Sequence, residues 1–197
     1  MLTPEQEARL FSGVSVADEY FRREGAILRA LENLTRLLDE SCIEYAITGA
    51  MGLTAYGFYR FPNHIDVLLT DEGLARFKAQ HPGYAETPRG MLDSTNGVHI
   101  NVQLAGKYPG DGKPKAVKFP DPSSSVAGER IRVLPMETLI ELKLASGIST
   151  VSRLKDLADI LELIQAIDLP ADFADRLDPS VRPKFQELWQ AAQSPEA

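Results

Sequence analysis

The sequence has little of what secreted and membrane proteins need. Its 197 residues include a single cysteine, Cys42, so no disulfide can form within the chain. No run approaches the roughly 18 apolar residues that a membrane span requires. The start, MLTPEQEARL, lacks the basic and then apolar order of a signal peptide. These absences predict a protein of the cytoplasm without a membrane partner.

Positive charge is also scarce. There are 21 Lys and Arg against 28 Asp and Glu, a formal net charge of −7 at pH 7. Such a balance disfavours capture of a nucleic-acid backbone, so bulk DNA binding is not expected. Any site for phosphate must depend on a few local residues. With 44% hydrophobic and 25% charged residues, the composition is that of a globular protein.

Hydrophobic spacing predicts strands mixed with helices, and then a helical tail. Strands are expected near 44–48, 64–69, 98–104 and 131–134. Helices are expected over 16–40, 50–56, 71–80, 135–146, 152–166 and 179–192, with an exposed loop at 107–125. This order indicates an α/β or α+β fold. We expect a core with N-terminal helices over 1–135 and a helical region packed on it over 136–197.

The segment around residues 48–66 is the most informative for chemistry. Thr48-Gly49-Ala50 forms a small-residue turn after a strand, where backbone N–H groups can hold a phosphate. On the next strand, His64 and Asp66 point to one side, roughly 6.6 Å apart. A two-metal phosphoryl-transfer site needs several carboxylates beside such a turn. Taken alone, these residues are more typical of a buried strand with one polar side chain than of such a site.

A second informative segment is 153–163, of the form RxKDxxDhxxL. Its apolar spacing predicts a buried stripe at Leu154, Leu157, Leu161 and Ile164. Lys155, Asp159 and Glu162 would then share a polar face, because they are four and three residues apart. By spacing alone this is a salt-bridged helix surface.

Four segments in order resemble the nucleotidyltransferase superfamily, above all its minimal and AbiEii-type branch, known from toxin–antitoxin systems. Residues 48–50 are similar to the G[G/S] motif, and 60–66 (RFPNHID) to RxxxDhD. Residues 134–146 are similar to a helix with a characteristic lysine, here Lys143, and 153–163 to the last motif. The resemblance covers roughly residues 25–190. It implies a mixed β-sheet flanked by helices, binding a nucleoside triphosphate with Mg²⁺ or Mn²⁺.

The resemblance also implies roles for individual residues. In the family, the two Asp of DhD and a third on the neighbouring strand hold the metals. They promote nucleotidyl transfer to a hydroxyl of a protein, a tRNA end or a small molecule. Here Gly49 and Ala50 would lie against the nucleotide, and Lys143 would contact the triphosphate. Lys155 and Asp156 would support the nucleotide-side wall or the transfer step.

The metal positions depart from that pattern. The first Asp of DhD is His64, the expected third Asp is Asn101, and only Asp66 remains. Even a quarter of the gross Coulomb attraction, about 2 kcal/mol, would cost more than tenfold in metal affinity for each lost carboxylate. Imidazole is also a poor ligand for Mg²⁺. Two-metal catalysis through these positions should be badly impaired, unless carboxylates such as Glu44 or Asp93 compensate.

A converted metal site is one alternative. If the strands of His64-x-Asp66 and His99-x-Asn101 are neighbours about 4.8 Å apart, their side chains converge. His64, His99 and Asp66 would suit Zn²⁺, Mn²⁺ or Ni²⁺ better than Mg²⁺. The other alternative is that both histidines are hydrogen-bonded residues of a disused cleft.

Three functions therefore stay open. The first is a nucleotidyltransferase-fold protein that binds a nucleotide but has weak or lost metal-dependent transfer. The second is an active nucleotidyltransferase of a toxin–antitoxin-like system that modifies tRNA or a partner protein. The third is a non-catalytic interaction scaffold that associates through helix 16–40 and the C-terminal helices.

Overall fold

The computed structural model describes residues 25–58, 62–128 and 131–194. The helices are 25–40, α2 (Gly49–Thr54), α3 (Asp71–Gln80), α4 (Met136–Ser149), α5 (Leu154–Ala166) and α6 (Arg182–Gln193). Short 3₁₀ turns occur at η1 (Pro122–Ser124), η2 (Val151–Arg153) and η3 (Ala171–Arg176). Of the predicted N-terminal helix, residues 16–24 lie outside the described residues, and so does Arg60 of the RFPNHID segment.

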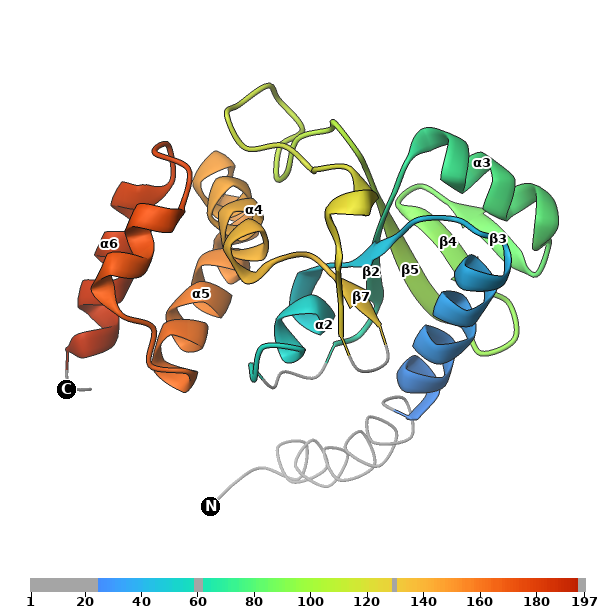
Figure 1. The fold of residues 1–197 in the computed structure, drawn as a ribbon, viewed down its shortest axis with the longest axis horizontal. Coiled ribbons are helices and arrows are strands. Elements are labelled where there is room, and N and C mark those ends of the chain that lie inside the picture. The colour runs from blue at the N-terminus through green and yellow to red at the C-terminus, as the bar shows by residue number, and fades with distance from the viewer. Residues whose placement is uncertain (1–24, 59–61, 129–130, 195–197) are drawn as a thin grey trace, which may run out of the picture.

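The described strands form one seven-stranded mixed sheet in the order β3-β4-β5-β2-β1-β7-β6 (Figure 1). The strands are β1 (Ala46–Ile47), β2 (Ile65–Leu69), β3 (Tyr84–Thr87), β4 (Gly90–Asp93), β5 (Val98–Leu104), β6 (Val126–Ala127) and β7 (Arg132–Val133). β2 runs parallel to β5 and antiparallel to β1, which in turn runs parallel to β7. The predicted fold class, a mixed sheet flanked by helices with a C-terminal helical lobe, is confirmed.

The central strand β2 is covered on both faces, which explains its almost continuous apolar sequence. Ile65, Val67 and Leu69 pack into the cluster that includes helix 25–40 and Phe77 of α3. Leu68 points the other way, into the cluster built by α4, α5 and α6. Because side chains alternate along a strand, Asp66 shares the face of Leu68. The one charged residue of β2 therefore lies on the face that the C-terminal helices cover.

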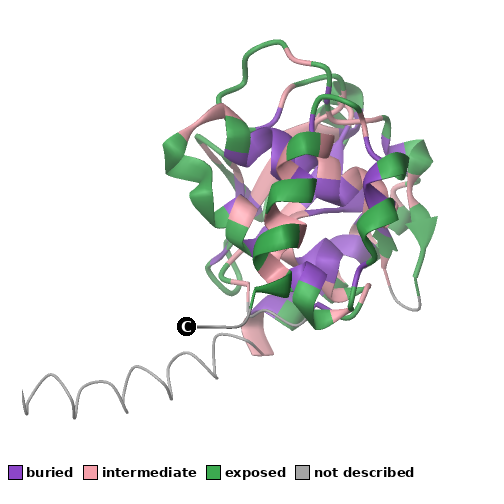
Figure 2. Ribbon diagram, turned by 90° about the vertical axis from the view of Figure 1, so that its left-hand side faces the viewer, coloured by how far each residue is buried: buried purple, intermediate pink, exposed green. Residues whose placement is uncertain are grey.

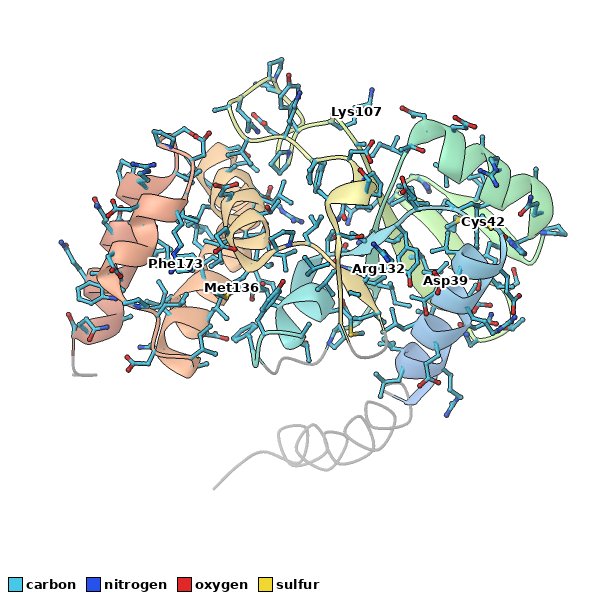
Figure 3. All side chains as sticks on the ribbon, viewed as in Figure 1. Asp39, Cys42, Lys107, Arg132, Met136 and Phe173 are labelled. Carbon is cyan, nitrogen blue, oxygen red and sulfur yellow. The ribbon has the colours of Figure 1, made fainter. Side chains whose placement is uncertain are left out.

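The C-terminal helices hold together through their own apolar contacts. Phe173 of η3 and Phe185 of α6 pack with ring centroids 5.8 Å apart, and Met136 packs against the same cluster (Figure 3). Figure 2 turns the left-hand side of Figure 1 toward the viewer and shows exposed residues on the outer turns of the helices, with buried residues beneath them. In the part of the chain that is described, no helix has the length and apolarity to cross a membrane.

The hairpin formed by β3 and β4 was not among the predicted elements. Its sequence, YAETPRGMLD, mixes exposed polar residues with few apolar ones, so it carries no clear alternation. The hairpin extends the sheet beyond β5, and only Tyr84, Met91 and Asp93 are buried. An edge hairpin of this kind forms because β5 offers it unpaired backbone groups, which the local sequence does not reveal.

Candidate functional site

The parallel pairing of β2 and β5 assembles a polar cluster around Asp66. Asp66 lies opposite Asn101, and Leu68 lies opposite Gln103. Asn101 Nδ2 donates to Asp66 Oδ1 at 3.1 Å, and Gln103 Nε2 donates to the same oxygen at 3.2 Å. The expectation that these two strands are neighbours is confirmed. One oxygen of the carboxylate is therefore held by two neutral amides.

The second oxygen of Asp66 is held from the other side. His64 Nε2 lies 3.1 Å from Asp66 Oδ2, and His64 Nδ1 lies 2.6 Å from Asn63 Oδ1. The side chain of His64 is 37% exposed, whereas that of Asp66 is 14% exposed. The histidine is therefore the more exposed residue of this pair.

Thr48 connects this cluster to the turn before α2. Its hydroxyl donates to Gln103 Oε1, and its backbone N–H donates to the carbonyl oxygen of Asp66 at 2.9 Å. Gln103 therefore bridges Thr48 and Asp66 with the two ends of one amide group. Thr48 was part of the predicted phosphate-binding turn, whereas Gln103 was not predicted as a site residue. The signal for Gln103 was its place two residues beyond Asn101, on the same face of the strand.

These contacts decide the ionisation of Asp66. Burial raises the pKa of the carboxyl, but hydrogen bonds from His64 and Asn101 and the electrostatic effects of His64 and Lys143 outweigh burial. The pKa consequently lies below its ordinary value of 3.8. Asp66 is an anion at neutral pH, with both oxygens engaged by protein donors.

A stability difference that depends on pH follows from this lowered pKa. A carboxyl with a folded-state pKa below its unfolded value stabilises the fold above the unfolded value. That stability is lost as the pH falls through the folded-state value. We expect Asp66→Asn to be less stable than the wild type at pH 7, and the difference to shrink as the pH falls below 3.8. Urea unfolding at a series of pH values measures it, and a difference that stays constant down to the lowest pH contradicts the assignment.

Gly49, the first residue of α2, allows the turn to pass close to Asp66. Its φ is +62°, a conformation that L residues rarely adopt, and a Cβ added there would lie 2.1 Å from Asp66 Oδ2. Ala50 follows as the second residue of the helix. The predicted small-residue turn and Asp66 are therefore in direct contact, and the space between them admits no side chain.

Gly112 provides a matched control for Gly49. Its φ is +72°, and a Cβ added there would meet no atom within 4 Å. We expect Gly49→Ala to lose about 2 kcal/mol more stability than Gly112→Ala, because only the former adds a steric clash to the backbone strain. Chemical denaturation of both variants measures the difference. Equal losses would mean that Asp66 does not lie against the turn.

The donor set around Asp66 does not fit a pair of magnesium ions. Mg²⁺ prefers hard oxygen ligands in octahedral geometry, yet the neighbours of this carboxylate are an imidazole and two amide nitrogens. Across residues 25–58, 62–128 and 131–194, no three His, Cys, Asp or Glu side chains form a group able to hold a metal. His99 is exposed, and it does not complete such a group with His64 and Asp66. The transition-metal site is therefore not assembled in this structure.

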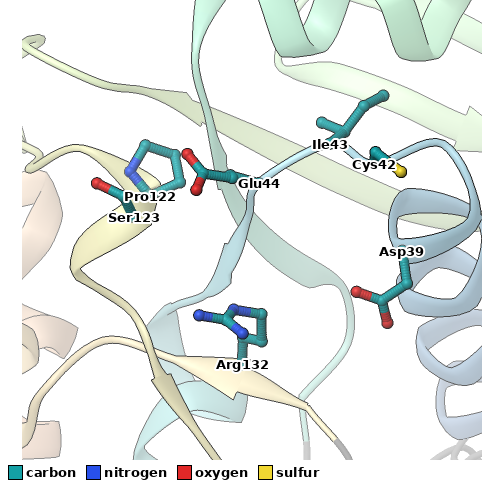
Figure 4. Close-up of a pocket in the computed structure, with 7 residues that line it drawn as sticks. All are labelled: Asp39, Cys42, Ile43, Glu44, Pro122, Ser123 and Arg132. Atoms are coloured by element: carbon teal, nitrogen blue, oxygen red, sulfur yellow. The ribbon is translucent and has the colours of Figure 1, made fainter.

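The two carboxylates that were considered as replacements lie elsewhere. Asp93 is buried, but it accepts hydrogen bonds from the Thr95 backbone N–H at 2.9 Å and from Asn96 Nδ2 at 2.7 Å, within its own hairpin turn. Glu44 lines a separate cavity of about 300 Å³ (Figure 4). The other lining residues of that cavity are Asp39, Cys42, Ile43, Pro122, Ser123 and Arg132. Neither carboxylate joins Asp66.

Lys143 lies in a second polar cluster, between α4 and α5. Its Nζ donates to Asp156 Oδ1 at 3.0 Å and to Asp159 Oδ2 at 2.6 Å, and all three residues are buried. Asp156 Oδ2 also accepts from Ser146 Oγ at 2.7 Å and from Arg153 Nε at 2.8 Å. The predicted residues Lys143 and Asp156 thus contact each other. The charge of Lys143 also acts on Asp66, so the two clusters are electrostatically linked.

The predicted buried stripe of α5 was wrong in part, since Ile164 is buried and Leu154 is not. Leu154 is 56% exposed, and Leu157 and Leu161 are only partly buried. The buried face consists of Asp156, Asp159, Ile160, Leu163 and Ile164. The helix is rotated relative to the predicted stripe because Lys143 pairs with both aspartates inside and Arg153 pairs with Asp156. Lys155 is exposed, as is Glu162.

Comparison with known proteins yields distant structural likenesses. No protein-family model matches the chain, and no curated protein matches it. The structure of ANT(2'')-Ia in complex with adenylyl-2''-tobramycin aligns with a TM-score of 0.49 at 16% identity, over 77% of this chain and 92% of that one. JHP933 from Helicobacter pylori aligns with a TM-score of 0.48 at 17% identity, over 88% and 91%.

A further Helicobacter pylori structure, provisionally named a nucleotidyltransferase, aligns with a TM-score of 0.46. The two sequences are 19% identical over 86% of this chain and 92% of that one. At these values the likeness concerns the overall chain path, and no residue role follows from it.

Proposed function

We propose that this chain is a nucleotidyltransferase-like protein that binds a nucleotide beside Gly49 and Asp66 and has weak or lost metal-dependent nucleotidyl transfer. The sequence motifs support the family, since four of them occur in order. The topology supports the proposal as well, because it brings the turn at 48–50, Asp66 and Asn101 into contact. The AbiEii-type branch is the relative that the motifs resemble most.

One observation carries the proposal of weak or lost transfer. Among the residues that the structure describes, Asp66 is the sole carboxylate of its cluster, and its oxygens contact His64 Nε2, Asn101 Nδ2 and Gln103 Nε2. Two-metal transfer requires carboxylates that hold both ions while the attacking and leaving oxygens are stabilised. Here a cation would have to displace the three groups that contact the Asp66 carboxylate. It would be attracted by the charge of that one carboxylate. The residues present instead hold Asp66 by hydrogen bonds to both of its oxygens.

Binding and transfer are tested by two measurements on one preparation. Nucleotides are titrated while the melting temperature is recorded, because a ligand that binds only the folded state raises it. Labelled triphosphates with Mg²⁺ or Mn²⁺ then test for transfer to the protein, to tRNA or to a co-purified partner. We expect a raised melting temperature and no transfer. Transfer that is lost in Asp66→Asn and kept in Glu162→Gln would establish the active enzyme instead.

An interaction scaffold is the second candidate, because the structure exposes apolar side chains where α4 meets α5. Ile148 is 48% exposed, Val151 79% and Leu154 56%. Adjacent exposed apolar residues are typical of protein contact surfaces. This candidate is favoured over the first if no nucleotide changes the melting temperature and a protein partner raises it.

A further inference from the structure

A small cavity with an apolar lining lies beside the C-terminal turn of α4. Its volume is about 200 Å³, and its lining includes Val117, Ala145 and Val181, which are all buried. Ile148 also lines the cavity and is 48% exposed, so the cavity reaches the surface there. Pockets for drug-sized ligands are larger, about 300–1,000 Å³. The cavity therefore suits one apolar side chain better than a small-molecule ligand.

The loop over residues 107–118 forms one wall of this cavity and is tied to α4. The backbone N–H of Asp111 donates to Ser149 Oγ at 3.2 Å. Lys115 lines the cavity, and its Nζ donates to Asp111 Oδ1 at 2.6 Å and to the carbonyl oxygen of Pro109 at 2.7 Å. These contacts hold the loop against the end of the helix, so the wall of the cavity is defined by the fold.

Exposed apolar side chains continue from the cavity along the junction of α4, η2 and α5. Five large apolar side chains are exposed among the described residues, and three of them are Ile148, Val151 and Leu154. Single exposed apolar residues are ordinary, whereas a group of them beside a cavity indicates a contact surface. We call these three residues the 148–154 patch.

Basic residues accompany this patch in an otherwise acidic protein. The loop 107–118 has four lysines and one aspartate, and residues 148–155 include two basic residues and no acidic one, although the whole chain carries −7. Lys107, Lys113 and Lys118 are exposed (Lys107 is labelled in Figure 3). None of these three lysines forms an ion pair with a residue that the structure describes.

The acidic residues next to the cavity and the patch are already engaged. Asp111 pairs with Lys115 at 2.6 Å, and Asp156 is buried. Asp178 is only partly exposed, and its carboxylate accepts from the backbone N–H of Ser180 at 2.9 Å and from its hydroxyl at 2.6 Å. The surface offered to a partner is therefore apolar at the patch and positive along the neighbouring loop and the start of α5.

We infer that the 148–154 patch docks an acidic peptide segment of a partner protein, with one apolar side chain of that segment in the cavity. The basic residues complement an acidic segment, and such complementarity steers association and fixes its register. A second copy of this chain fits less well, because a symmetric dimer would place the same basic residues opposite one another. A membrane fits less well because a bilayer surface does not fill a cavity of side-chain size.

This inference goes beyond nucleotide binding, since none of its residues belongs to the cluster around Asp66. It also states the kind of partner that an interaction scaffold of this shape would take. Its test therefore does not depend on whether a nucleotide binds.

Selection from a random peptide library displayed on phage, with the full chain as target at low ionic strength, tests the inference. We expect the enriched peptides to share an excess of Asp and Glu and one large apolar residue. A labelled copy of the most enriched peptide is then titrated by fluorescence anisotropy, where added salt should weaken binding. No enrichment, or enriched peptides without the acidic excess, overturns the inference.

Matched substitutions locate the surface that binds the peptide. Ile148→Asp should weaken binding at least tenfold, whereas Val126→Asp changes an apolar residue of similar exposure, 44% against 48%, and should leave binding unchanged. Val151→Asp should weaken binding at least threefold, and its 79% exposed side chain can change without disturbing the fold. Binding that Ile148→Asp and Val151→Asp both leave unchanged, or that Val126→Asp weakens equally, contradicts the inference.

A pair of double variants tests the role of charge. Lys113→Gln, Lys118→Gln should weaken peptide binding at least fivefold and reduce its dependence on salt. Arg36→Gln, Lys78→Gln removes the same charge from two other helices and should change neither. Equal effects of the two double variants would contradict charge complementarity at this surface.

The two other occupants are distinguished by separate measurements on the wild type and Ile148→Asp. A dimer in size-exclusion chromatography that Ile148→Asp abolishes would assign the patch to a second copy. Binding to phosphatidylserine vesicles that Ile148→Asp abolishes would assign it to a membrane. Either result overturns the acidic peptide as the occupant, and we expect a monomer that does not bind the vesicles.

Discussion

Replacing Lys143 with alanine is expected to lower the free energy of unfolding by about 3–5 kcal/mol, because two buried carboxylates lose their shared cation. Lys143 Nζ lies 3.0 Å from Asp156 Oδ1 and 2.6 Å from Asp159 Oδ2, between α4 and α5. Arg153 contacts only Asp156 among these aspartates and is itself half exposed, so it does not replace the lysine. Denaturant unfolding followed by circular dichroism measures the loss.

Two controls make the result specific to the buried cluster. Lys155→Ala removes the same charge from the exposed face of α5 and should change stability by less than about 0.5 kcal/mol. The triple variant Lys143→Met, Asp156→Asn, Asp159→Asn removes all three charges and should recover most of the loss. This variant keeps the test decisive if Lys143→Ala does not fold. A loss below about 1 kcal/mol in Lys143→Ala would contradict a buried ion cluster.

The second large effect is a gain of metal binding in His64→Asp, Asn101→Asp. Asn101 Nδ2 and His64 Nε2 each lie 3.1 Å from an oxygen of Asp66, so carboxylates at these positions would converge on it. Each added carboxylate should contribute about 2 kcal/mol toward a divalent ion, which is more than tenfold in affinity. Without metal the three like charges repel, so the variant should melt below the wild type in EDTA and recover with Mn²⁺.

A single substitution on the same strand serves as its control. His99→Asp adds one carboxylate to an exposed position of β5 and should not create Mn²⁺ binding. The double variant should bind Mn²⁺ at least a hundredfold more tightly than the wild type in a calorimetric titration. If the double variant and the wild type bind Mn²⁺ equally, positions 64 and 101 do not meet at Asp66.

Much of the fold could be predicted because the hydrophobic spacing of each helix or strand lies within its own short segment of the sequence. The apolar run at 65–69 predicts an interior strand, and both faces of β2 are indeed buried. Polar edge elements give weaker signals, and β3 and β4 formed a hairpin that was not predicted. Their pairing depends on β5 and not on their own composition.

The site was predictable only in part, for two physical reasons. Spacing placed Asp66 and Asn101 on strands that turned out to be neighbours, but the register that adds Gln103 depends on how β2 and β5 align. The helical spacing of α5 is also compatible with two buried faces. The sequence favoured the face richer in leucine, whereas the face with Asp156 and Asp159 is buried. The acidic face turned inward because Lys143, on another helix, supplies the compensating charge.

The most direct test of the central claim is a titration of the unmodified protein with Mn²⁺, followed by electron paramagnetic resonance of the ion that stays in solution. A saturated carboxylate at Asp66, with an imidazole and two amides around it, predicts that the Mn²⁺ signal equals that of the same solution without protein, with or without nucleotide. A stoichiometric loss of signal that Asp66→Asn abolishes would show a working metal centre and contradict the account.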